Sequence, residues 1–410
     1  MSEAFDFKGG FANNLPAPAA KWGGFPKYNF VGGHNDPDGI PVEGLIEAAE
    51  RVLRRRGHTL ATYNVDSGPL GDRELRQFLA DKMKKYRGFA PSADEILVTP
   101  GSNPALMLLY DVFINPGDTV IAEEFSYSGA LGRIRSRGAT IVGAKLDGQG
   151  LRADHLAELL EAQRKAGVKA KFIYTIPTIQ NPTSTVMPVQ RRREILDVSR
   201  QYGVPVIEDE CYADLLWEEK WPDSMRAMEG SEHVIHVGSF SKYLSPALRL
   251  GYVTAPWPVL AQMLPLKNDG GTNALAQMVV ADFMRAHYDD HVTALKGRLK
   301  RKRDALIEAL EEQFGAAAEY DVPPGGIYLW VKLPEVVDTQ KLAAPALTEG
   351  VAFNPGPEWA VDGKTATRYL RLCYAYPSEA TIREGVARLA EVCHREFGVP
   401  VRSANVARGA

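Results

Sequence analysis

Short apolar segments alternate with amphipathic segments through the middle of this 410-residue sequence. From residue 95 onward the apolar segments read EILVT, TVIAE, ATIVGA, KFIYTI, VPVIED, HVIHVGSF and RLGYVTA. Amphipathic stretches such as 154–166 and 190–202 lie between them. This alternation is typical of a mostly parallel β-sheet that is covered by helices on both faces. The sequence therefore predicts an α/β fold whose large domain is built on a seven-stranded sheet.

The two ends of the chain differ from its middle. The first 40 residues are rich in Gly, Pro and Asn and are typical of an irregular arm, and a helix is expected at 42–56. A long charged helix leads from residue 288 into the strand-like segments GGIYLWVKL and RYLRLCYA and a closing helix at 379–397. We therefore predict an N-terminal arm (1–40), a large domain (41–287), whose first helices are free to pack with the small domain, and a smaller α+β domain (288–410).

Charge and composition exclude several kinds of protein. The 48 basic and 51 acidic residues leave a net charge of −3, so no overall field favours nucleic acid or an anionic membrane. Three widely spaced cysteines argue against a disulfide framework and favour a reducing cytoplasm. The N-terminus lacks a signal-peptide pattern, and no apolar run is long enough to span a bilayer. We expect a cytoplasmic protein that is neither exported by a standard signal nor membrane-spanning.

In open α/β sheets, ligands bind beyond the carboxyl ends of the strands, so the residues that follow the apolar segments are candidates for chemistry. The segment Ser239-Phe240-Ser241-Lys242 follows HVIHVG, and Arg249 comes seven residues after the lysine. An amine at this place can form an imine, while hydroxyls and a guanidinium can hold a phosphate dianion. The alternative is an ordinary surface lysine in a Ser-rich loop.

Three consecutive acids, Glu208-Asp209-Glu210, follow the segment VPVI. An aspartate beside a pyridine nitrogen keeps the ring protonated, so that the ring withdraws electrons from a substrate carbon. Asp209 is our candidate for this role, and with Lys242 it indicates pyridoxal 5'-phosphate (PLP) as the cofactor. A metal site and a helix N-terminus remain alternatives for the three acids.

Two further turns carry weaker signals. Ser102 and Asn103 follow EILVT and open an apolar helix, where backbone amides can bind phosphate, although either residue can simply be a helix cap. Asn181-Pro182 follows KFIYTI, and the asparagine amide can bond a phenolic oxygen such as O3′ of the cofactor. An Asn-Pro segment can equally be an ordinary turn that ends a strand, and the setting also suits a cis Pro182.

Taken in order, these motifs resemble the class I and II aminotransferases, PLP-dependent enzymes of fold type I. The resemblance is closest to the branch that contains 2-aminoadipate and kynurenine aminotransferases, and it covers nearly the whole chain. It is carried by the segments FVGGHNDPDGIP, TYNVDSGPLGDRELR, VTPGSNPAL, NPGDTVIAEEFSYSGAL, QNPTSTVMP, IEDECY, GSFSKYLSPALRLGY, PPGGIYLWVKLP, NPG and YLRLCYA.

The resemblance implies a role for each matching residue in cofactor binding. Lys242 would be the Schiff-base lysine and the acid/base of the reaction, and Asp209 would pair with the pyridine nitrogen. Asn181 and Tyr212 would bond O3′, and Tyr127 would stack on the ring. The phosphate would be held by Ser102, Asn103, Ser239, Ser241 and Arg249.

It also implies a homodimer with shared active sites, because Tyr63 matches a tyrosine that reaches the phosphate of the neighbouring subunit. The α-carboxylate of the substrate would bind Arg371. Gly33, His34 and Asn181 would complete the substrate site.

The expected reaction is a ping-pong transfer of an amino group between an α-amino acid and a 2-oxo acid, with 2-oxoglutarate or pyruvate as one partner. The alternative is a lyase, decarboxylase or oxidase that uses the same cofactor. A PLP-binding transcriptional regulator and a binding protein that has lost catalysis are weaker alternatives, since no helix-turn-helix pattern precedes the fold and Lys242 is present.

The sequence departs from the family pattern at two places. Relatives read Gly-Gly-Leu-Pro where this chain has Gly32-Gly33-His34-Asn35. They read Asn-Pro-Thr-Gly where this chain has Asn181-Pro182-Thr183-Ser184. We hypothesise that His34 or Asn35 favours a substrate with a polar or acidic side chain over an aliphatic one. Ser184 is expected to alter only a turn.

Overall fold

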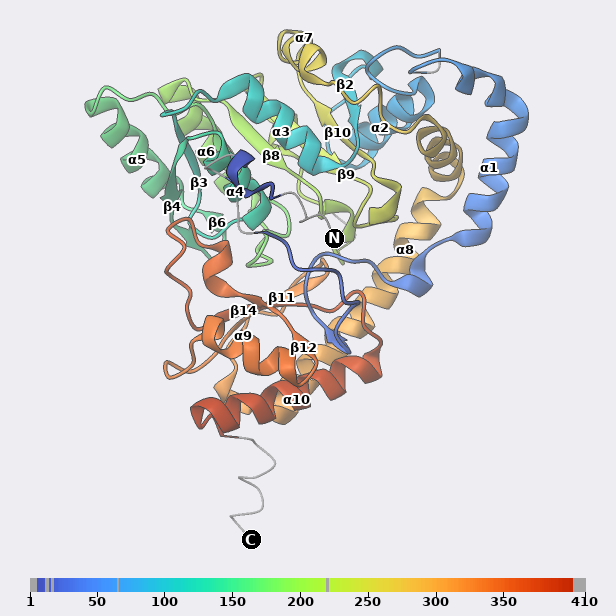
Figure 1. Cartoon of the computed structure of the whole chain (residues 1–410). Helices are drawn as coiled ribbons and strands as arrows, with labels where there is room; N and C mark the ends of the chain where they lie inside the picture. The colour runs from blue at the N-terminus through green and yellow to red at the C-terminus, as the bar shows by residue number, and fades with distance from the viewer. Residues whose placement is uncertain (1–5, 12–14, 16–17, 65, 219–220, 401–410) are drawn as a thin grey trace.

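The computed structural model describes residues 6–11, 15, 18–64, 66–218 and 221–400. Figure 1 shows a large lobe, which contains the main sheet, above a small lobe that contains β11, β14 and α10. Helix α8 (Ala274–Gln313) runs from one lobe into the other. The predicted boundary between 287 and 288 falls inside this continuous helix, so both lobes share it.

The large lobe is built on a seven-stranded sheet with the order β2-β10-β9-β8-β7-β3-β4. Strand β10 is antiparallel to both of its neighbours, and all other neighbours are parallel. The predicted mostly parallel sheet is thus confirmed, and each predicted apolar segment contributes one strand. The strands are β2 (Ile96–Thr99), β3 (Thr119–Glu123), β4 (Thr140–Ala144), β7 (Ile173–Thr175), β8 (Val206–Asp209), β9 (Val234–Ser239) and β10 (Gly251–Thr254).

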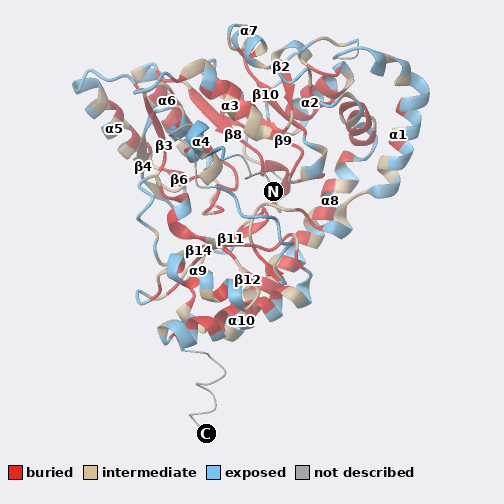
Figure 2. Ribbon diagram, in the orientation of Figure 1, coloured by how far each residue is buried: buried red, intermediate tan, exposed pale blue. Residues whose placement is uncertain are grey.

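Helices cover both faces of this sheet. Successive residues of a strand point to opposite faces. On β3, Val120 packs into a core cluster with α3, α4 and α7, while Ile121 packs into another with α5 and α6. Figure 2 shows most strands of the sheet as buried and the outer helix faces as exposed. The helices of the large lobe are α1 (Val42–Arg56), α2 (Arg73–Tyr86), α3 (Ser102–Phe113), α4 (Ser128–Ser136), α5 (Ala153–Lys165), α6 (Val189–Tyr202) and α7 (Trp257–Leu266).

The small lobe contains a three-stranded antiparallel sheet with the order β11-β14-β13. Its strands are β11 (Tyr328–Lys332), β13 (Asn354–Pro355) and β14 (Tyr369–Cys373), and its helices are α9 (Thr339–Thr348) and α10 (Glu379–Phe397). The remaining strands are β1 (Tyr28–Asn29), β5 (Leu146–Asp147), β6 (Gly150–Leu151) and β12 (Val351–Ala352). Short 3-10 helices lie at Lys8–Gly10, Pro37–Gly39, Gly57–Ala61, Ala93–Glu95, Ala213–Leu215, Met225–Ala227, Pro246–Leu248, Gly315–Ala317 and Gly356–Trp359.

The N-terminal arm is attached to the small lobe at two points. Strand β1 of the arm pairs in parallel with β12. Further along, the buried carboxylate of Asp36 binds Arg298 at 2.5 Å and Lys302 at 2.9 Å, both on α8. The Lys302 amine also donates to the Ala375 carbonyl at 2.7 Å, two residues beyond β14. These contacts hold the arm residues that come between them against the mouth of the site described next.

Candidate active site

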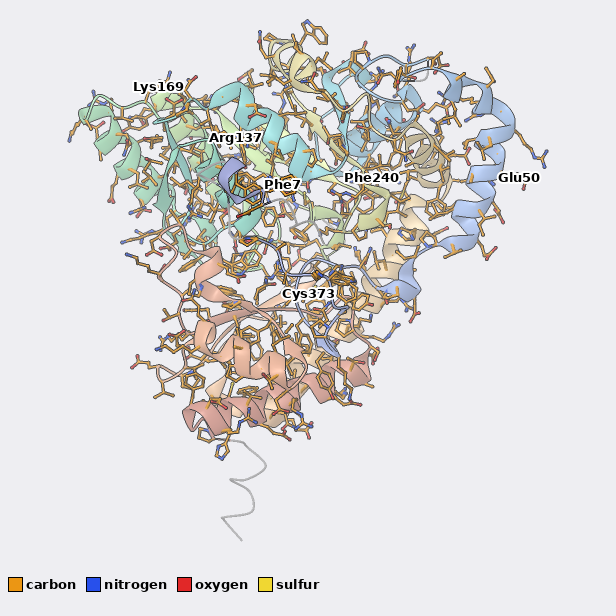
Figure 3. All side chains as sticks on the ribbon, in the orientation of Figure 1. Phe7, Glu50, Arg137, Lys169, Phe240 and Cys373 are labelled. Atoms are coloured by element: carbon orange, nitrogen blue, oxygen red, sulfur yellow. The ribbon has the colours of Figure 1, made fainter. Side chains whose placement is uncertain are left out.

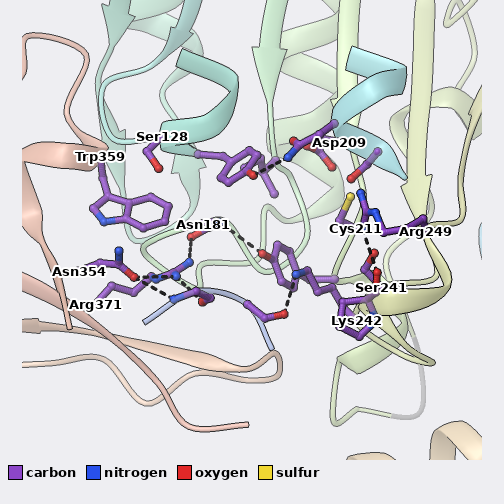
Figure 4. Close-up of a pocket in the computed structure, with 18 residues that line it drawn as sticks. Ser128, Asn181, Asp209, Cys211, Ser241, Lys242, Arg249, Asn354, Trp359 and Arg371 are labelled. Carbon is purple, nitrogen blue, oxygen red and sulfur yellow. Dashed lines mark hydrogen bonds between the residues drawn. The ribbon is translucent and has the colours of Figure 1, made fainter. Parts of the chain in front are cut away.

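A pocket lies at the carboxyl ends of β8 and β9, where the two lobes meet (Figure 4). Its wall contains most of the residues that the sequence singled out: Gly33, Ser102, Asn103, Tyr127, Asn181, Asp209, Tyr212, Ser241, Lys242, Arg249 and Arg371. It also contains residues that the sequence reasoning missed: Gly32, Ser128, Ile176, Cys211, Pro246, Asn354 and Trp359. Residues from both lobes and from the arm therefore share one cavity.

The Lys242 amine lies beside the arm. It follows β9 and donates a hydrogen bond to the Gly33 carbonyl at 2.8 Å. A Cβ on Gly33 would lie 2.5 Å from that nitrogen, so a larger residue there would displace the amine from this position. Burial lowers the pKa of Lys242, and the nearby positive charges of Arg371 and Arg249 lower it further. A lowered pKa increases the fraction of neutral amine, the form that attacks carbonyl carbons.

One end of the pocket is suited to a phosphate. The first residues of α3, Ser102 and Asn103, lie there with the hydroxyl of Ser241 and the guanidinium of Arg249. A Cβ on Gly101 would lie 2.5 Å from the Arg249 guanidinium, and one on Gly251 would lie 2.5 Å from the Ser102 amide nitrogen. The two glycines thus let a helix N-terminus and an arginine approach each other, which is a favourable arrangement for an anion.

Ser239 does not line this pocket. It is buried at the end of β9, where its hydroxyl oxygen accepts a hydrogen bond from the Ser241 amide at 3.1 Å. Ser239 therefore binds the backbone of Ser241, and of the two serines only Ser241 lines the pocket.

At the centre of the pocket, Asp209 has one carboxylate oxygen with a partner and one without. Its Oδ2 atom accepts a hydrogen bond from the Tyr174 hydroxyl at 2.7 Å, whereas its buried Oδ1 atom has no partner among the described residues. Burial raises the pKa of this carboxyl group. Buried polar atoms are almost always hydrogen-bonded, so an unpaired oxygen here fits a donor that comes from a ligand. A protonated pyridine nitrogen is such a donor.

Two hydrogen-bonded pairs surround Asp209. The Asn181 amide donates to the Tyr212 hydroxyl at 3.3 Å, and the Asn103 amide donates to the Tyr127 hydroxyl at 3.0 Å. Each pair joins residues from separate strand ends. The residues present therefore fit the ring, the phenolic oxygen and the phosphate of PLP.

The two acids on either side of Asp209 point away from the pocket. Glu210 accepts hydrogen bonds from Thr178 at 2.7 Å and from Arg87. Glu208 accepts a hydrogen bond from the Met225 amide at 2.6 Å. No group of His, Cys, Asp or Glu within the described ranges could hold a metal ion, so the metal alternative is not supported.

Arg371 lies on β14, opposite Lys242. Its guanidinium donates to the Asn181 side-chain oxygen at 3.0 Å and to the Asn354 side-chain oxygen at 3.1 Å. The guanidinium carbon lies 4.1 Å from the centre of the Trp359 ring and 5.1 Å from that of Tyr328. Stacking of this kind fixes the orientation of an arginine. The only sequence signal for Asn354 and Trp359 was the segment NPGPEW, which contains both.

The loop that carries Asn181 has an unusual backbone. The Asn181-Pro182 bond is cis, as the sequence suggested, and Ile179 and Ser184 have positive φ angles of 57° and 62°. Positive φ is rare for residues other than glycine, above all for a β-branched one. The Ser184 hydroxyl donates to the Tyr328 carbonyl at 3.2 Å, so this departure from the family pattern also makes a contact with the small lobe.

The arm residues that follow Gly33 lie outside the pocket wall. The His34 ring packs against Gly32 and lies 5.0 Å from Phe25 and 5.7 Å from Tyr376 between ring centres. Asn35, the other residue of the hypothesis on substrate preference, is not in the pocket wall. Its buried amide donates to the Leu244 carbonyl at 3.0 Å and its side-chain oxygen accepts from the next backbone amide, so Asn35 holds the arm in place.

Tyr63 lies away from the Lys242 pocket of its own chain. It follows the 3-10 helix after α1 and is 87% exposed. Its ring lies beside Gly270, on the surface of the large lobe.

The sequence matches the family described as aminotransferase class I and II over residues 33–389. It is 33% identical over 372 residues to aromatic-amino-acid aminotransferase 1 of Thermococcus litoralis, a match that covers 90% of this chain and 88% of that protein. It is 34% identical over 367 residues to the Bacillus subtilis protein named uncharacterized HTH-type transcriptional regulator YisV, covering 88% of this chain and 73% of that protein.

A solved structure agrees with the fold. It is alpha-aminoadipate aminotransferase LysN from Thermus thermophilus, complexed with N-(5'-phosphopyridoxyl)-L-leucine. It superposes with a TM-score of 0.83 at 31% identity, covering 91% of this chain and 93% of that one. Because the family match spans most of the sequence and the pocket fits the cofactor, the chain belongs to the class I and II aminotransferases and is a PLP-dependent transaminase of fold type I that moves an amino group between an α-amino acid and a 2-oxo acid.

Proposed function

We propose that Lys242 holds the cofactor covalently and also moves the proton that transamination requires. PLP, when bound, supplies an aldehyde carbon that takes up the amino group and a ring that withdraws electrons from the substrate α-carbon. The observation that supports this role is the position of the Lys242 amine. It lies in one cavity with the unpaired Asp209 oxygen and the Arg371 guanidinium, and its pKa is lowered. A neutral amine at this place can accept a proton from the substrate and return it.

Other residues hold the cofactor in place in this proposal. Asp209 pairs with the pyridine nitrogen and Tyr127 packs on the ring, while Asn181 and Tyr212 bond the phenolic oxygen. The groups for the phosphate are Ser102, Asn103, Ser241 and Arg249, with Ser239 supporting Ser241 through its hydrogen bond. Charge-assisted hydrogen bonds from an arginine and a helix N-terminus suit a phosphate dianion.

The substrate carboxylate binds Arg371 in this proposal. Asn354 and Trp359 orient the guanidinium, so a planar carboxylate can meet two N–H groups at once. The carboxylate would replace protein oxygens, such as the Gly32 carbonyl, that now accept from Arg371 at 2.5 Å. An α-amino acid held there presents its α-carbon toward Lys242 across the pocket.

We propose that the side chain of the preferred amino donor carries no charge. The cations in the described pocket wall are Lys242, Arg249 and Arg371, and each already has a role. Burial lowers the pKa of His34, which favours its neutral form. The rings of Phe25 and Tyr376 beside His34 instead favour an apolar or aromatic side chain, in place of the polar or acidic one that the sequence suggested. The similar proteins are named for aromatic amino acids and for α-aminoadipate, so their names do not decide the matter.

The variant His34→Leu tests this proposal. We expect kcat/KM for phenylalanine to change less than about threefold, and the preference for phenylalanine over glutamate to persist. A fall that is specific to glutamate would show that His34 recognises an acidic side chain instead.

A second copy of the chain completes the site in our proposal. Helix α1 exposes Val42, Ile46 and Leu53 on one face, and Glu50 projects from it away from the rest of the protein (Figure 3). Apolar side chains in such a row mark a surface for a partner. Tyr63 would cross to the phosphate of the other subunit. Mixing an inactive Lys242→Ala chain with a Tyr63→Ala chain should restore part of the activity, because one site of the mixed dimer then has both residues.

We also propose a cytoplasmic location. All three cysteines are free and buried, which suits a reducing compartment. Within the described residues, none of the helices has the length and apolar character that crossing a membrane requires.

The reaction is tested by mixing the purified protein with single amino acids and following the absorbance of the cofactor. We expect the absorbance of the aldehyde form to disappear and to return when 2-oxoglutarate or pyruvate is added. Release of carbon dioxide, or consumption of oxygen, would contradict transamination.

A further inference from the structure

We infer that Tyr328 is a positioning residue that holds the Asn181 loop and Arg371 in fixed relation to each other across the two lobes. The inference rests on the proposed roles of Asn181 and Arg371. Tyr328 is the first residue of β11 and pairs with Cys373 of β14, so it belongs to the small lobe. It does not line the pocket, yet its side chain contacts three parts of it.

The first contact is with the loop. The fully buried Tyr328 hydroxyl donates a hydrogen bond to the Ile179 carbonyl at 2.9 Å. At the other end of the loop, the Ser184 hydroxyl donates to the Tyr328 carbonyl at 3.2 Å. One residue of the small lobe therefore binds the loop on both sides of Asn181. Burial raises the pKa of Tyr328 well above its usual value, so the hydroxyl keeps its proton and remains a donor.

This loop needs such support because its backbone is strained. Ile179 and Ser184 both occupy the left-handed region, which side chains other than glycine disfavour and surrounding contacts must enforce. From the large lobe, the Gln180 amide donates to the Glu123 carboxylate at 2.9 Å. From the small lobe, the Tyr328 hydroxyl binds the Ile179 carbonyl. Asn181 is thus fixed between an anchor in each lobe.

The second and third contacts are with the ring of Tyr328. The Tyr212 ring meets it edge to face, with centres 5.1 Å apart and planes at 89°. The Arg371 guanidinium carbon lies 5.1 Å from the centre of the Tyr328 ring. Tyr328 therefore contacts Tyr212 and Arg371 directly and Asn181 through the loop. Because Arg371 also donates to Asn181, a shift of any of these groups is transmitted to the others.

Tyr374 provides a matched control. It is equally buried, and its hydroxyl donates to the Gly326 carbonyl at 2.9 Å, so a change to phenylalanine removes the same kind of hydrogen bond. Within the described residues, neither carbonyl that accepts from this hydroxyl belongs to the pocket wall, and Tyr374 lies in the same lobe as Tyr328.

The experiment compares Tyr328→Phe with Tyr374→Phe as holoenzymes. We expect Tyr328→Phe to lower kcat/KM for the amino acid about 10-fold to 100-fold, because small misplacements of positioned groups have effects of that size. KM should rise, since the loop that carries Asn181 loses a hydrogen bond and Arg371 donates to Asn181. The pH at which the absorbance of the bound cofactor changes should also shift, since Asn181 and Tyr212 lie at its phenolic oxygen. Tyr374→Phe should lower Tm by a similar amount. It should change neither kcat/KM, nor KM, nor the pH midpoint of the cofactor absorbance.

Ser184→Ala keeps the inference testable if Tyr328→Phe folds poorly. It removes the other hydrogen bond to Tyr328 at the far end of the loop, and we expect a smaller shift of the absorbance midpoint in the same direction. Equal effects of the Tyr328 and Tyr374 variants on kcat/KM, KM and the absorbance midpoint would overturn the inference.

Asn181→Ala separates this inference from the roles on which it rests. If Asn181→Ala leaves the absorbance midpoint unchanged, the proposed role of Asn181 fails. If Asn181→Ala shifts the midpoint and Tyr328→Phe does not, the role of Asn181 stands and the positioning role of Tyr328 fails.

Discussion

Glu208, Asp209 and Glu210 are neighbours in the chain but lie in two different environments. Asp209 faces the pocket, where its Oδ1 atom has no hydrogen-bond partner within the described structure. Glu208 and Glu210 face the opposite way, into a buried layer where Arg192 lies 3.7 Å and 3.4 Å from their carboxylate oxygens. Burial alone would raise the pKa of Glu208, but the bond with His236 and the charge of Arg192 lower it to about 2.

The difference separates groups that serve stability from groups that serve chemistry. In the buried layer, each carboxylate has cations and hydrogen-bond donors within the chain, so its partners are complete before any ligand arrives. In the pocket, Asp209 and Lys242 have pKa values shifted by burial and contacts that a ligand would complete. Incomplete partners at buried charged groups are a mark of a functional site. Changes on the two sides should therefore act on different measurements.

The largest expected effect is on the pocket side, at Lys242. The variant Lys242→Ala removes the amine that moves the proton, and we expect kcat to fall about 10,000-fold, the upper end of what acid–base catalysis supplies. The free energy of unfolding should change little. Lys302→Ala is the matched control, because this buried lysine pairs with Asp36 and should affect stability more than kcat per folded molecule. A residual kcat near the wild-type value would refute the role of Lys242.

The next effect is on the buried layer, at Arg192. The variant Arg192→Met leaves two buried carboxylates without their shared cation, and we expect a loss of about 3–5 kcal/mol in the free energy of unfolding. Denaturant titration measures it. The exposed pair of Arg388 and Glu391 is the control, since Arg388→Met should cost less than about 1 kcal/mol. Equal losses would show that the buried layer contributes no more than a surface pair.

Glu123 sharpens the comparison because it has hydrogen bonds but, among the described residues, no ion pair. Its carboxylate accepts from Thr175 at 2.6 Å and from Gln180 at 2.9 Å. Burial nevertheless raises its pKa from 4.5 to about 7. Between these two values the folded chain holds a proton that the unfolded chain has lost, so stability should fall as pH rises through this range, by about 3 kcal/mol.

The variant Glu123→Gln cannot titrate. Its free energy of unfolding should lack this fall between about pH 4.5 and 7, whatever its absolute stability. Denaturant titrations at several pH values check the difference in slope, and parallel curves for the variant and the wild type would contradict the raised pKa.

The smallest of these effects is expected at Asp209. The variant Asp209→Asn keeps the shape of the side chain but not its charge, and we expect kcat/KM to fall about 100-fold, which corresponds to about 2.7 kcal/mol. In the absence of cofactor its stability should equal or exceed that of the wild type, because a buried, poorly paired carboxylate has been removed. A loss of stability comparable to that of Arg192→Met would show that Asp209 serves stability as the buried layer does.

The sequence predicted the sheet correctly, and most of the residues that it singled out share one pocket, for physical reasons. Buried parallel strands must be continuously apolar, and residues at their ends, such as Asp209 and Lys242, stand out by their chemistry. Trp359 and Asn354 were missed because an aromatic and an amide in a loop look like ordinary packing until Arg371 is placed beside them. The hydrogen bond of Asn35 to the Leu244 carbonyl could not be predicted, because the two residues lie 209 positions apart in the sequence.

Local sequence was enough to predict the strand pattern and to single out Lys242, Asp209 and the Ser102 turn as candidates, because each lies in or directly after a short segment with a recognisable pattern. The contacts that bring these residues together depend on the packing of the two lobes. The hold of Tyr328 on the Asn181 loop spans 149 residues of sequence, and the bond between Arg371 and Asn181 spans 190. Contacts between side chains so far apart in the chain have no local pattern, since they depend on how the two lobes pack against each other.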